Sequence, residues 1–288
     1  MLKSLYTGIS GIKANQTKLD VIGNNVANVG TTAYKKGNVR FADTLYQSKS
    51  FTIGPSGKFG GSNAINVGLG VNVAGIVTDT NQGSLQLTGR TTDLAMDGDG
   101  YFLVATGEGT QANPFSYSYT RDGSFTIDKN GDLVTLDGHR VMGKDLDANG
   151  DPTGDLKPIN IPTVVNGHGV VDFTVSVDKN GVVTLVLDDG TQVNHGIIEV
   201  AVFPNPESLK PVGSNKYKPT PNTGDAVWLT DGDTALFGKV TQGAIEMSNV
   251  DISEEFTEMI VTTRAFQSAS KVVTTSDELL QEIINLKR

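Results

Sequence analysis

Two long stretches at the ends of this 288-residue chain carry the spacing of amphipathic helices. In the first, from residue 1 to about residue 30, apolar residues recur at alternating steps of three and four. Only Gln16 and Gly23 interrupt the series. This is the a and d pattern of a helix that packs on another helix through one narrow stripe. A helix of about 25 residues is roughly 38 Å long, and it cannot bury such a stripe on itself, so the pattern predicts a partner.

The last stretch, from Ile252 to Ile284, repeats the pattern and supplies that partner. Asp251 with Glu254 three residues later is a variant of the capping box that begins many helices. The stripe again contains polar residues, among them Thr263, Ser270 and Asp277. The apolar positions that we predict to form a subunit interface are Leu2, Leu5, Ile9, Ile12, Leu19, Val26, Ile252, Phe256, Met259, Phe266, Val273, Leu280 and Ile284.

Alternation with a period of two characterises the chain from about Val71 to Phe203. It predicts strands over 71–78, 84–88, 101–104, 115–119 and 197–203. The tetrapeptide Asp-Lys-Asn-Gly occurs at 128–131 and again at 178–181, each time between apolar runs. Each copy predicts a β-hairpin, because Asn and Gly adopt the backbone angles of tight turns.

Together these patterns predict a mixed α and β fold. Long N- and C-terminal helices pair as a coiled coil, with a central antiparallel all-β domain between them. We expect residues 1–30 with 248–288 to form the terminal-helix coiled-coil domain and residues 76–247 to form the β domain. Residues 31–75 contain several Gly and Pro breakers and are expected to be an extended connector.

Charge and composition narrow the possible functions. The formal net charge of −9 argues against nucleic acid as a partner. Residues 1–40 are basic and residues 250–288 are acidic, which fits two ends that meet. No cysteine is present, so disulfides, thiol nucleophiles and cysteine zinc sites are excluded. No apolar run resembles a cleavable signal peptide or a membrane span. If the protein leaves the cell, we expect a dedicated exporter to carry it.

Candidate catalytic and metal-binding motifs are incomplete. Phe59 follows Gly57-Lys58 where a phosphate-binding loop needs Ser or Thr. Residues 145–150 begin like a calcium-binding loop, but Leu156 occupies the twelfth position, where a bidentate Glu is required. We therefore expect no enzyme, no catalytic residue, no metal site and no cofactor. A secreted calcium-binding β protein is the alternative from another functional class.

Two interpretations of the terminal helices remain. They could fold back onto the β domain as an ordinary amphipathic pair, or they could pair together and associate with copies of themselves. The polar positions in both stripes favour self-association, because Thr, Ser, Asp and Gln are poor residues for a monomer core.

The residues at both ends resemble a known family. Residues 2–12 and 19–29, which include Asn-Asn-Val-Ala-Asn at 24–28, are similar to the N-terminal motif of bacterial flagellar axial proteins. These are the rod, hook and hook-associated proteins. Residues 92–102 and 120–125 match motifs shared by the hook and rod, and residues 246–261 and 274–288 resemble the hook protein. The family-motif residues are Asn24, Asn25, Ala27, Asn28, Tyr34 and Lys35.

The resemblance implies a fold and a function. In that family the terminal helices form an inner layer around an export channel, and the β domain forms an outer tube. It implies a structural subunit of the flagellar hook that self-assembles into a flexible tube and transmits torque from rod to filament. A distal rod subunit of the basal body is the alternative. The implied partners are further copies in a helical homopolymer, the rod, the hook cap, the hook–filament junction proteins and the export apparatus.

Two features depart from the family pattern. Thr32-Ala33-Tyr34 stands where the family commonly has a Gly-Phe pair. Residues 145–200 supply only a few strands where many hook proteins have a long outermost domain. This shortness favours the rod alternative.

Overall fold

The computed structural model describes residues 2–55, 60–107, 109, 114–147, 152–162, 164–165, 168–178, 180–187, 191–230 and 237–286. The chain divides into two compact units. A helical unit contains Met1–Asn28, Lys36–Asp79 and Val250–Arg288, and a β unit contains Val29–Lys35 and Thr80–Asn249. The chain therefore passes from one unit to the other four times.

The helical unit is built on two helices, α1 (Leu2–Ala27) and α2 (Ile252–Leu286). Strand β1 (Gly37–Asp43) pairs with β4 (Val71–Thr78), and β2 (Tyr46–Ser50) pairs with β3 (Ile65–Gly68). Residues 31–75 are thus richer in regular structure than the extended connector expected from their breakers. None of the described helices combines the length and apolar character that crossing a membrane requires.

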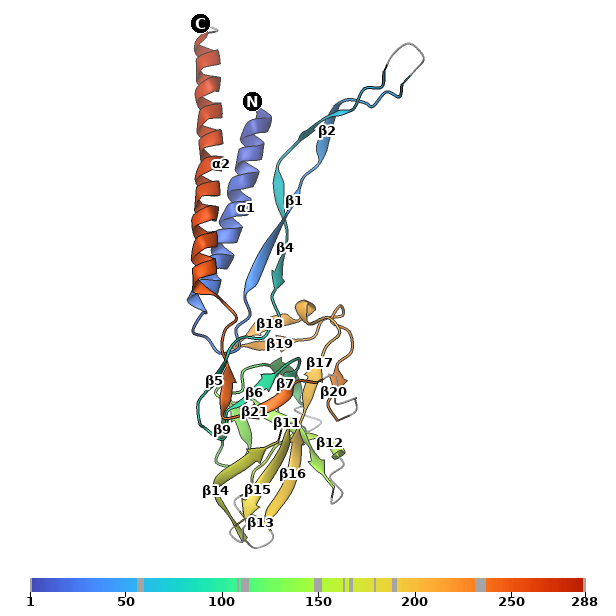
Figure 1. Ribbon diagram of the computed structural model, residues 1–288, viewed down its shortest axis with the longest axis vertical. Coiled ribbons are helices and arrows are strands. Elements are labelled where there is room, and N and C mark those ends of the chain that lie inside the picture. Colours follow the sequence, from blue (N-terminus) through green and yellow to red (C-terminus); the bar gives the residue numbers. More distant parts are fainter. Residues whose placement is uncertain are drawn as a thin grey trace. The chain divides into compact units, whose positions relative to one another are not determined.

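Helix α1 packs against α2 on one side and against β1 and β4 on another, and the two helices lie side by side in Figure 1. Small residues allow the helices to approach closely. A Cβ added at Gly8 would lie 2.8 Å from Val273 Cγ2, and one at Gly11 would lie 3.5 Å from Ala269 Cβ. On the strand side, the Ser10 hydroxyl accepts a hydrogen bond of 3.3 Å from the backbone N–H of Val71. Glycine on α1 therefore sets the distance between the helices.

The side of α2 that is protected from solvent differs by one residue from the predicted stripe. Buried and half-buried residues follow the series Glu255, Met259, Thr262, Phe266, Ala269, Val273, Ser276 and Leu280. The predicted series shares Met259, Phe266, Val273 and Leu280. Of its other positions, Thr263 and Ser270 are also half-buried, whereas Phe256 and Asp277 are exposed. Both series keep steps of three and four, so spacing alone cannot distinguish them. The small side chains of Thr262, Ala269 and Ser276 permit close packing, and Phe256 is left in solvent.

The N-terminus of α2 is capped as its sequence predicts. The Asp251 carboxylate accepts hydrogen bonds from the backbone N–H groups of Ser253 and Glu254, at 2.7 Å and 3.3 Å. Glu254 and Glu255 lie in the first turn, where the helix dipole favours negative charge.

The β unit is an antiparallel assembly of short strands. Its main path runs in the order β13-β14-β15-β16-β11-β7-β8-β19-β18 within a sheet of 14 described strands. The bounds on this path are β7 (Tyr101–Thr106), β8 (Ser116–Thr120), β11 (Arg140–Leu146), β13 (Val164–Val165), β14 (His168–Val177), β15 (Val182–Leu187), β16 (Gln192–Ile198), β18 (Lys210–Gly213) and β19 (Lys216–Lys218). The other elements are β5 (Leu85–Leu87), β6 (Leu94–Asp97), β9 (Phe125–Ile127), β10 (Leu133–Thr135), β12 (Pro152–Pro158), β17 (Val200–Val202), β20 (Val227–Trp228), β21 (Lys239–Gln242), β22 (Ala244–Glu246) and the 3-10 turn η1 (Pro206–Ser208).

Strand β7 is the centre of the core because its residues are apolar on both faces. Phe102 and Val104 belong to one hydrophobic cluster, which also contains Phe125. Tyr101 and Leu103 belong to a second cluster on the opposite face. A continuous apolar run is typical of a strand buried on both sides. The run Tyr-Phe-Leu-Val-Ala therefore indicates a central strand of the sheet.

Both predicted hairpins are present. At 128–131 the Gly131 N–H donates to the Asp128 carbonyl at 2.9 Å, between β9 and β10. At 178–181 the Gly181 N–H donates to the Asp178 carbonyl at 2.8 Å, between β14 and β15. Both glycines have a positive φ, 87° and 79°, which explains why glycine closes each turn.

Candidate functional site

The Asn25 side chain joins three chain segments of the helical unit. Its Oδ1 accepts from the Gly37 N–H at 3.0 Å, and its Nδ2 donates to the Gly37 carbonyl at 3.0 Å. The same Nδ2 donates to Glu255 Oε2 at 3.2 Å. An amide side chain can pair with a peptide group in this two-bond manner because it carries the same donor and acceptor. Buried Asn25 therefore holds the end of α1, the start of β1 and the first turn of α2 together.

The other family-motif residues have less central positions. Asn28 Nδ2 donates to the Asn24 carbonyl at 2.9 Å, which helps to end α1, and Ala27 is the last residue of that helix. In the β unit, the Tyr34 carbonyl accepts from the Asn249 N–H at 3.3 Å. Lys35 differs from these residues because its charged side chain is buried.

Three buried charges form a cluster in the β unit, and we call Lys35, Arg121 and Glu246 the buried charge cluster. Lys35 Nζ lies 2.5 Å from Glu246 Oε1, and Arg121 Nε lies 3.7 Å from Glu246 Oε2. The side chains are only 2%, 3% and 0% exposed, respectively. Glu246 Oε1 also accepts from the Gly83 N–H at 2.9 Å, and Lys35 Nζ donates to the Asn81 carbonyl at 2.7 Å. Charges this deeply buried require partners.

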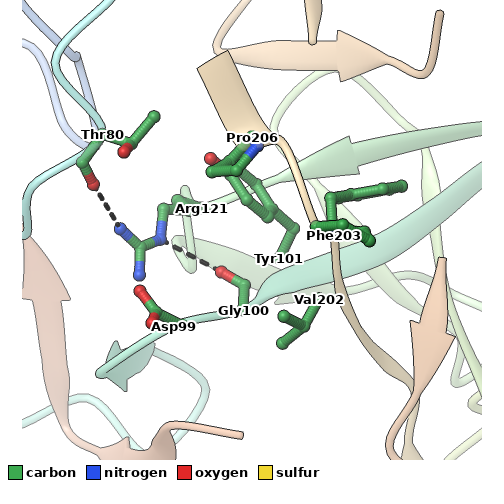
Figure 2. Close-up of a pocket in the computed structure, with 9 residues that line it drawn as sticks. Thr80, Asp99, Gly100, Tyr101, Arg121, Val202, Phe203 and Pro206 are labelled. Atoms are coloured by element: carbon green, nitrogen blue, oxygen red, sulfur yellow. Dashed lines mark hydrogen bonds between the residues drawn. The ribbon is translucent and has the colours of Figure 1, made fainter. Parts of the chain in front are cut away.

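Arg121 is held by backbone carbonyl groups beside a pocket of about 290 Å³. Figure 2 shows its guanidinium directed at the carbonyls of Gly100 and Thr80, at 3.0 Å and 3.4 Å. It also donates to the Gly98 carbonyl, and its Cζ lies 5.4 Å from the centre of the Tyr101 ring. Each guanidinium nitrogen thus has an acceptor within the β unit. We assign Arg121 a structural role, because a substrate-binding arginine would direct donors into the pocket.

A second ionic group joins two turns of the β unit. Lys216 Nζ lies 2.9 Å from Asp137 Oδ2 and 3.0 Å from His139 Nδ1. Burial, followed by the charge of Lys216, lowers the pKa of His139 below its usual value. This shift favours the neutral imidazole, whose Nδ1 can accept a hydrogen bond from Lys216 Nζ. The hydrogen bond from Lys216 lowers the pKa of Asp137.

The predicted interface residues divide between two environments. Half-buried within the chain are Leu5, Ile12, Leu19, Val26, Met259, Phe266, Val273 and Leu280. Exposed are Ile9, Ile252, Phe256 and Ile284, and the side chain of Leu2 lies outside the described residues. Helix α2 also exposes Ile260, Val261, Val272, Leu279 and Ile283. So many exposed large apolar side chains on one helix favour a role in protein–protein contacts.

The calcium alternative falls largely on residues that the structure does not describe. Asp145 and Asp147 are described, but Asn149 and Gly150 of the proposed loop lie outside the described residues. Among the described residues, no group of three or more His, Asp and Glu side chains is placed to hold a metal ion.

Comparison with known proteins identifies the family. Residues 5–35 match the model described as flagella basal body rod protein, residues 95–197 match the flagellar hook protein FlgE/F/G D1 domain, and residues 241–286 match the flagellar basal body rod FlgEFG protein C-terminal model. The flagellar basal-body rod protein FlgG of Bacillus subtilis is 44% identical over 288 residues, covering all of both chains. The chain belongs to the flagellar rod and hook protein family. It is thus a structural subunit of the flagellar axis.

Two other relatives show the range of this family. FlgG of Borreliella burgdorferi is 34% identical over 297 aligned residues, and the hook protein FlgE of the same organism is 27% identical over 451, each covering all of both chains.

Each of the three family segments contributes one charge to the buried charge cluster. Lys35 comes from the segment 5–35, Arg121 from 95–197 and Glu246 from 241–286. The segments that define the family are therefore joined by ionic contacts inside the β unit.

The family motif includes Lys35 and Asn25, but the sequence did not predict a role for Arg121, Glu246 or Glu255. Arg121 and Glu246 lie in the stretches 120–125 and 246–261 as polar residues without a distinctive spacing. The position of Glu246 gave one indication that its side chain is buried, because this acid follows the apolar pair Ala244-Ile245 in a strand-like run.

Proposed function

We propose that this chain is a distal rod subunit of the flagellar basal body. The observation that carries this proposal is the rod protein FlgG of Bacillus subtilis, which aligns over 288 residues at 44% identity. The alignment with the hook protein FlgE extends over 451 residues at 27% identity. The hook function expected from the C-terminal motif is therefore the less well supported of the two.

The proposed mechanism of assembly rests on the helical unit. The chain is exported by the flagellar export apparatus and joins a helical homopolymer of its own copies. Helices α1 and α2 pair as a coiled coil, and the exposed apolar residues of α2 contact neighbouring copies. Such contacts join two different surfaces, and head-to-tail contacts of this type extend into open helical polymers. Further rod proteins and hook proteins are the proposed neighbours at the two ends of the polymer.

Labelling isolated hook–basal bodies with an antibody against this chain tests the rod assignment. We expect the label on the rod, between the membrane-embedded base and the start of the hook. A label along the length of the hook would support the hook alternative instead. Hook subunits labelled in the same particles mark the boundary between the two segments.

Replacing Phe256 with aspartate should prevent assembly without unfolding the monomer. The side chain is 48% exposed in the single chain, so the substitution disturbs little there. Burying a phenylalanine in a subunit contact is worth about 1.5–3 kcal/mol, equivalent to about 10- to 100-fold in critical concentration. A buried aspartate would add a further cost. Sedimentation and electron microscopy of the purified full chain measure the polymer.

Thr257→Asp is the matched control, because Thr257 is the next residue of α2 and is also exposed. It adds the same charge without removing an apolar side chain, so polymerisation should change much less. Equal polymerisation of the Phe256 variant and the unmodified chain would show that this face of α2 is not a subunit contact.

A further inference from the structure

Residues 29–35 belong to the β unit, although the residues on both sides of them belong to the helical unit. We call this segment the clip. Its two ends are tied together within the helical unit, since Asn25 forms two hydrogen bonds with Gly37. The clip is therefore a loop that is closed by the hydrogen bonds between Asn25 and Gly37. These bonds do not involve the residues of the clip itself. Its departure from the β unit would leave α1 and β1 joined to each other.

Polar contacts hold the clip in the β unit, among them the hydrogen bond of 2.7 Å from Lys35 Nζ to the Asn81 carbonyl. Lys35 Nζ binds Glu246 Oε1 at 2.5 Å, and the Ala33 N–H donates to the Glu246 carbonyl at 2.8 Å. The Tyr34 carbonyl accepts from the Asn249 N–H at 3.3 Å. The Thr32 carbonyl accepts from Asn215 Nδ2 at 2.8 Å. The clip is thus held mainly by hydrogen bonds and one ion pair, which form and break as local events.

Ala33 holds the clip in an unfavourable backbone conformation. Its φ is +53°, in the left-handed region that disfavours residues with a Cβ atom. The side chain is buried, so the surrounding structure maintains this angle. The bound clip therefore stores strain that its release would remove.

The β unit retains a cation for Glu246 if Lys35 leaves. Among the described residues, Glu246 Oε2 has no hydrogen-bond partner, yet Arg121 Nε lies only 3.7 Å away. A small movement would bring the guanidinium into hydrogen-bonding distance. Glu246 Oε1 would keep the Gly83 N–H at 2.9 Å. Loss of Lys35 would thus leave a buried carboxylate that still has a cation beside it.

We propose that the clip is a releasable tether between the two units. When it is bound, the chain passes between the units four times, after residues 28, 35, 79 and 249. When it is released, only the passages after 79 and 249 remain. Lys35, Glu246 and Ala33 set the balance between the bound and the released state of the clip.

Hydrogen exchange of the full-length monomer, measured by mass spectrometry, tests this proposal. Lys35→Met should accelerate exchange of the amides at 33–35 by about 10- to 100-fold, the factor that a hydrogen bond to a charged group contributes. Amides of β7 and β8 should stay within about twofold of the unmodified chain. Lys36→Met is the matched control, because Lys36 pairs with the exposed carboxylate of Glu254 inside the helical unit. It should leave the clip unchanged.

Ala33→Gly should have the opposite effect and slow exchange of the clip, because glycine tolerates a φ of +53°. Two results would overturn the proposal. If β7 and β8 accelerate as much as the clip in Lys35→Met, the clip is an integral part of the β unit. If the clip does not accelerate, Lys35 does not hold it.

Discussion

Replacing Glu246 with alanine should lower the free energy of unfolding of the β unit by about 3–5 kcal/mol. Its carboxylate lies between Lys35 Nζ at 2.5 Å and Arg121 Nε at 3.7 Å. Without it, Lys35 and Arg121 lose the buried carboxylate that lies between them, and the Gly83 N–H loses its acceptor. Removing one partner of a buried ion pair is costly for this reason. The single tryptophan, Trp228, lies in the β unit, so its fluorescence during urea denaturation measures this unit.

Asp145→Ala provides the control for this experiment. Asp145 pairs with Lys157 at 3.3 Å, but the two side chains are 59% and 62% exposed. An exposed pair is worth less than about 1 kcal/mol, so this variant should unfold at nearly the same urea concentration as the unmodified chain. Similar losses of unfolding free energy in both variants would mean that the buried charge cluster stabilises the β unit no more than an exposed ion pair does.

Replacing Gly8 with leucine should destabilise the packing of α1 on α2 by about 1–3 kcal/mol, the usual cost of overpacking. Even a Cβ atom at this position would lie 2.8 Å from Val273 Cγ2 and 3.4 Å from the Ala269 carbonyl oxygen. The remaining atoms of leucine would force the helices apart. Most of the stability of helices in proteins comes from the packing of their amphipathic faces, so separation should reduce helix content. Far-UV circular dichroism of the full-length monomer during heating measures this effect.

The matched control lies on the same helix. A Cβ atom at Gly23 would have no neighbour within 4 Å, so Gly23→Leu meets no obstacle in the single chain. Leucine favours helix over glycine by about 0.5–1 kcal/mol, and this variant should therefore stabilise α1 slightly. If both substitutions change the melting temperature in the same direction, close packing at Gly8 does not limit the helix pair.

Several elements were predictable because their signals are local. The hairpin at 128–131 follows from Asn-Gly chemistry, and the cap at Asp251 follows from its position before an apolar helical pattern. Strand β7 follows from a continuous apolar run. In each case the residues that carry the signal are within a few positions of the structure that they specify.

The buried face of α2, in contrast, was not predictable from local signals alone. Phe256 fits the predicted stripe by spacing and by hydrophobicity, yet the structure protects Thr262, Ala269 and Ser276 instead. Gly8 of α1 lies against Val273 and the Ala269 backbone of α2, a close approach that the spacing of apolar residues on α2 does not predict. Which of the two overlapping stripes of α2 faces α1 depends on the shape of α1. The sequence of α2 alone therefore does not specify the packed face.

By itself the sequence determined the element types, the antiparallel hairpins, the flanking long helices and the family, because periodicity, turn chemistry and motifs act over short distances. Only the tertiary structure decided which charges are buried together. Lys35, Arg121 and Glu246 are separated by 86 and 125 positions in the chain, and any of them alone is an ordinary surface residue type. Folding removes all three side chains from water, and a buried charge is stable only beside a partner of opposite charge. Their structural role therefore depends on the tertiary fold.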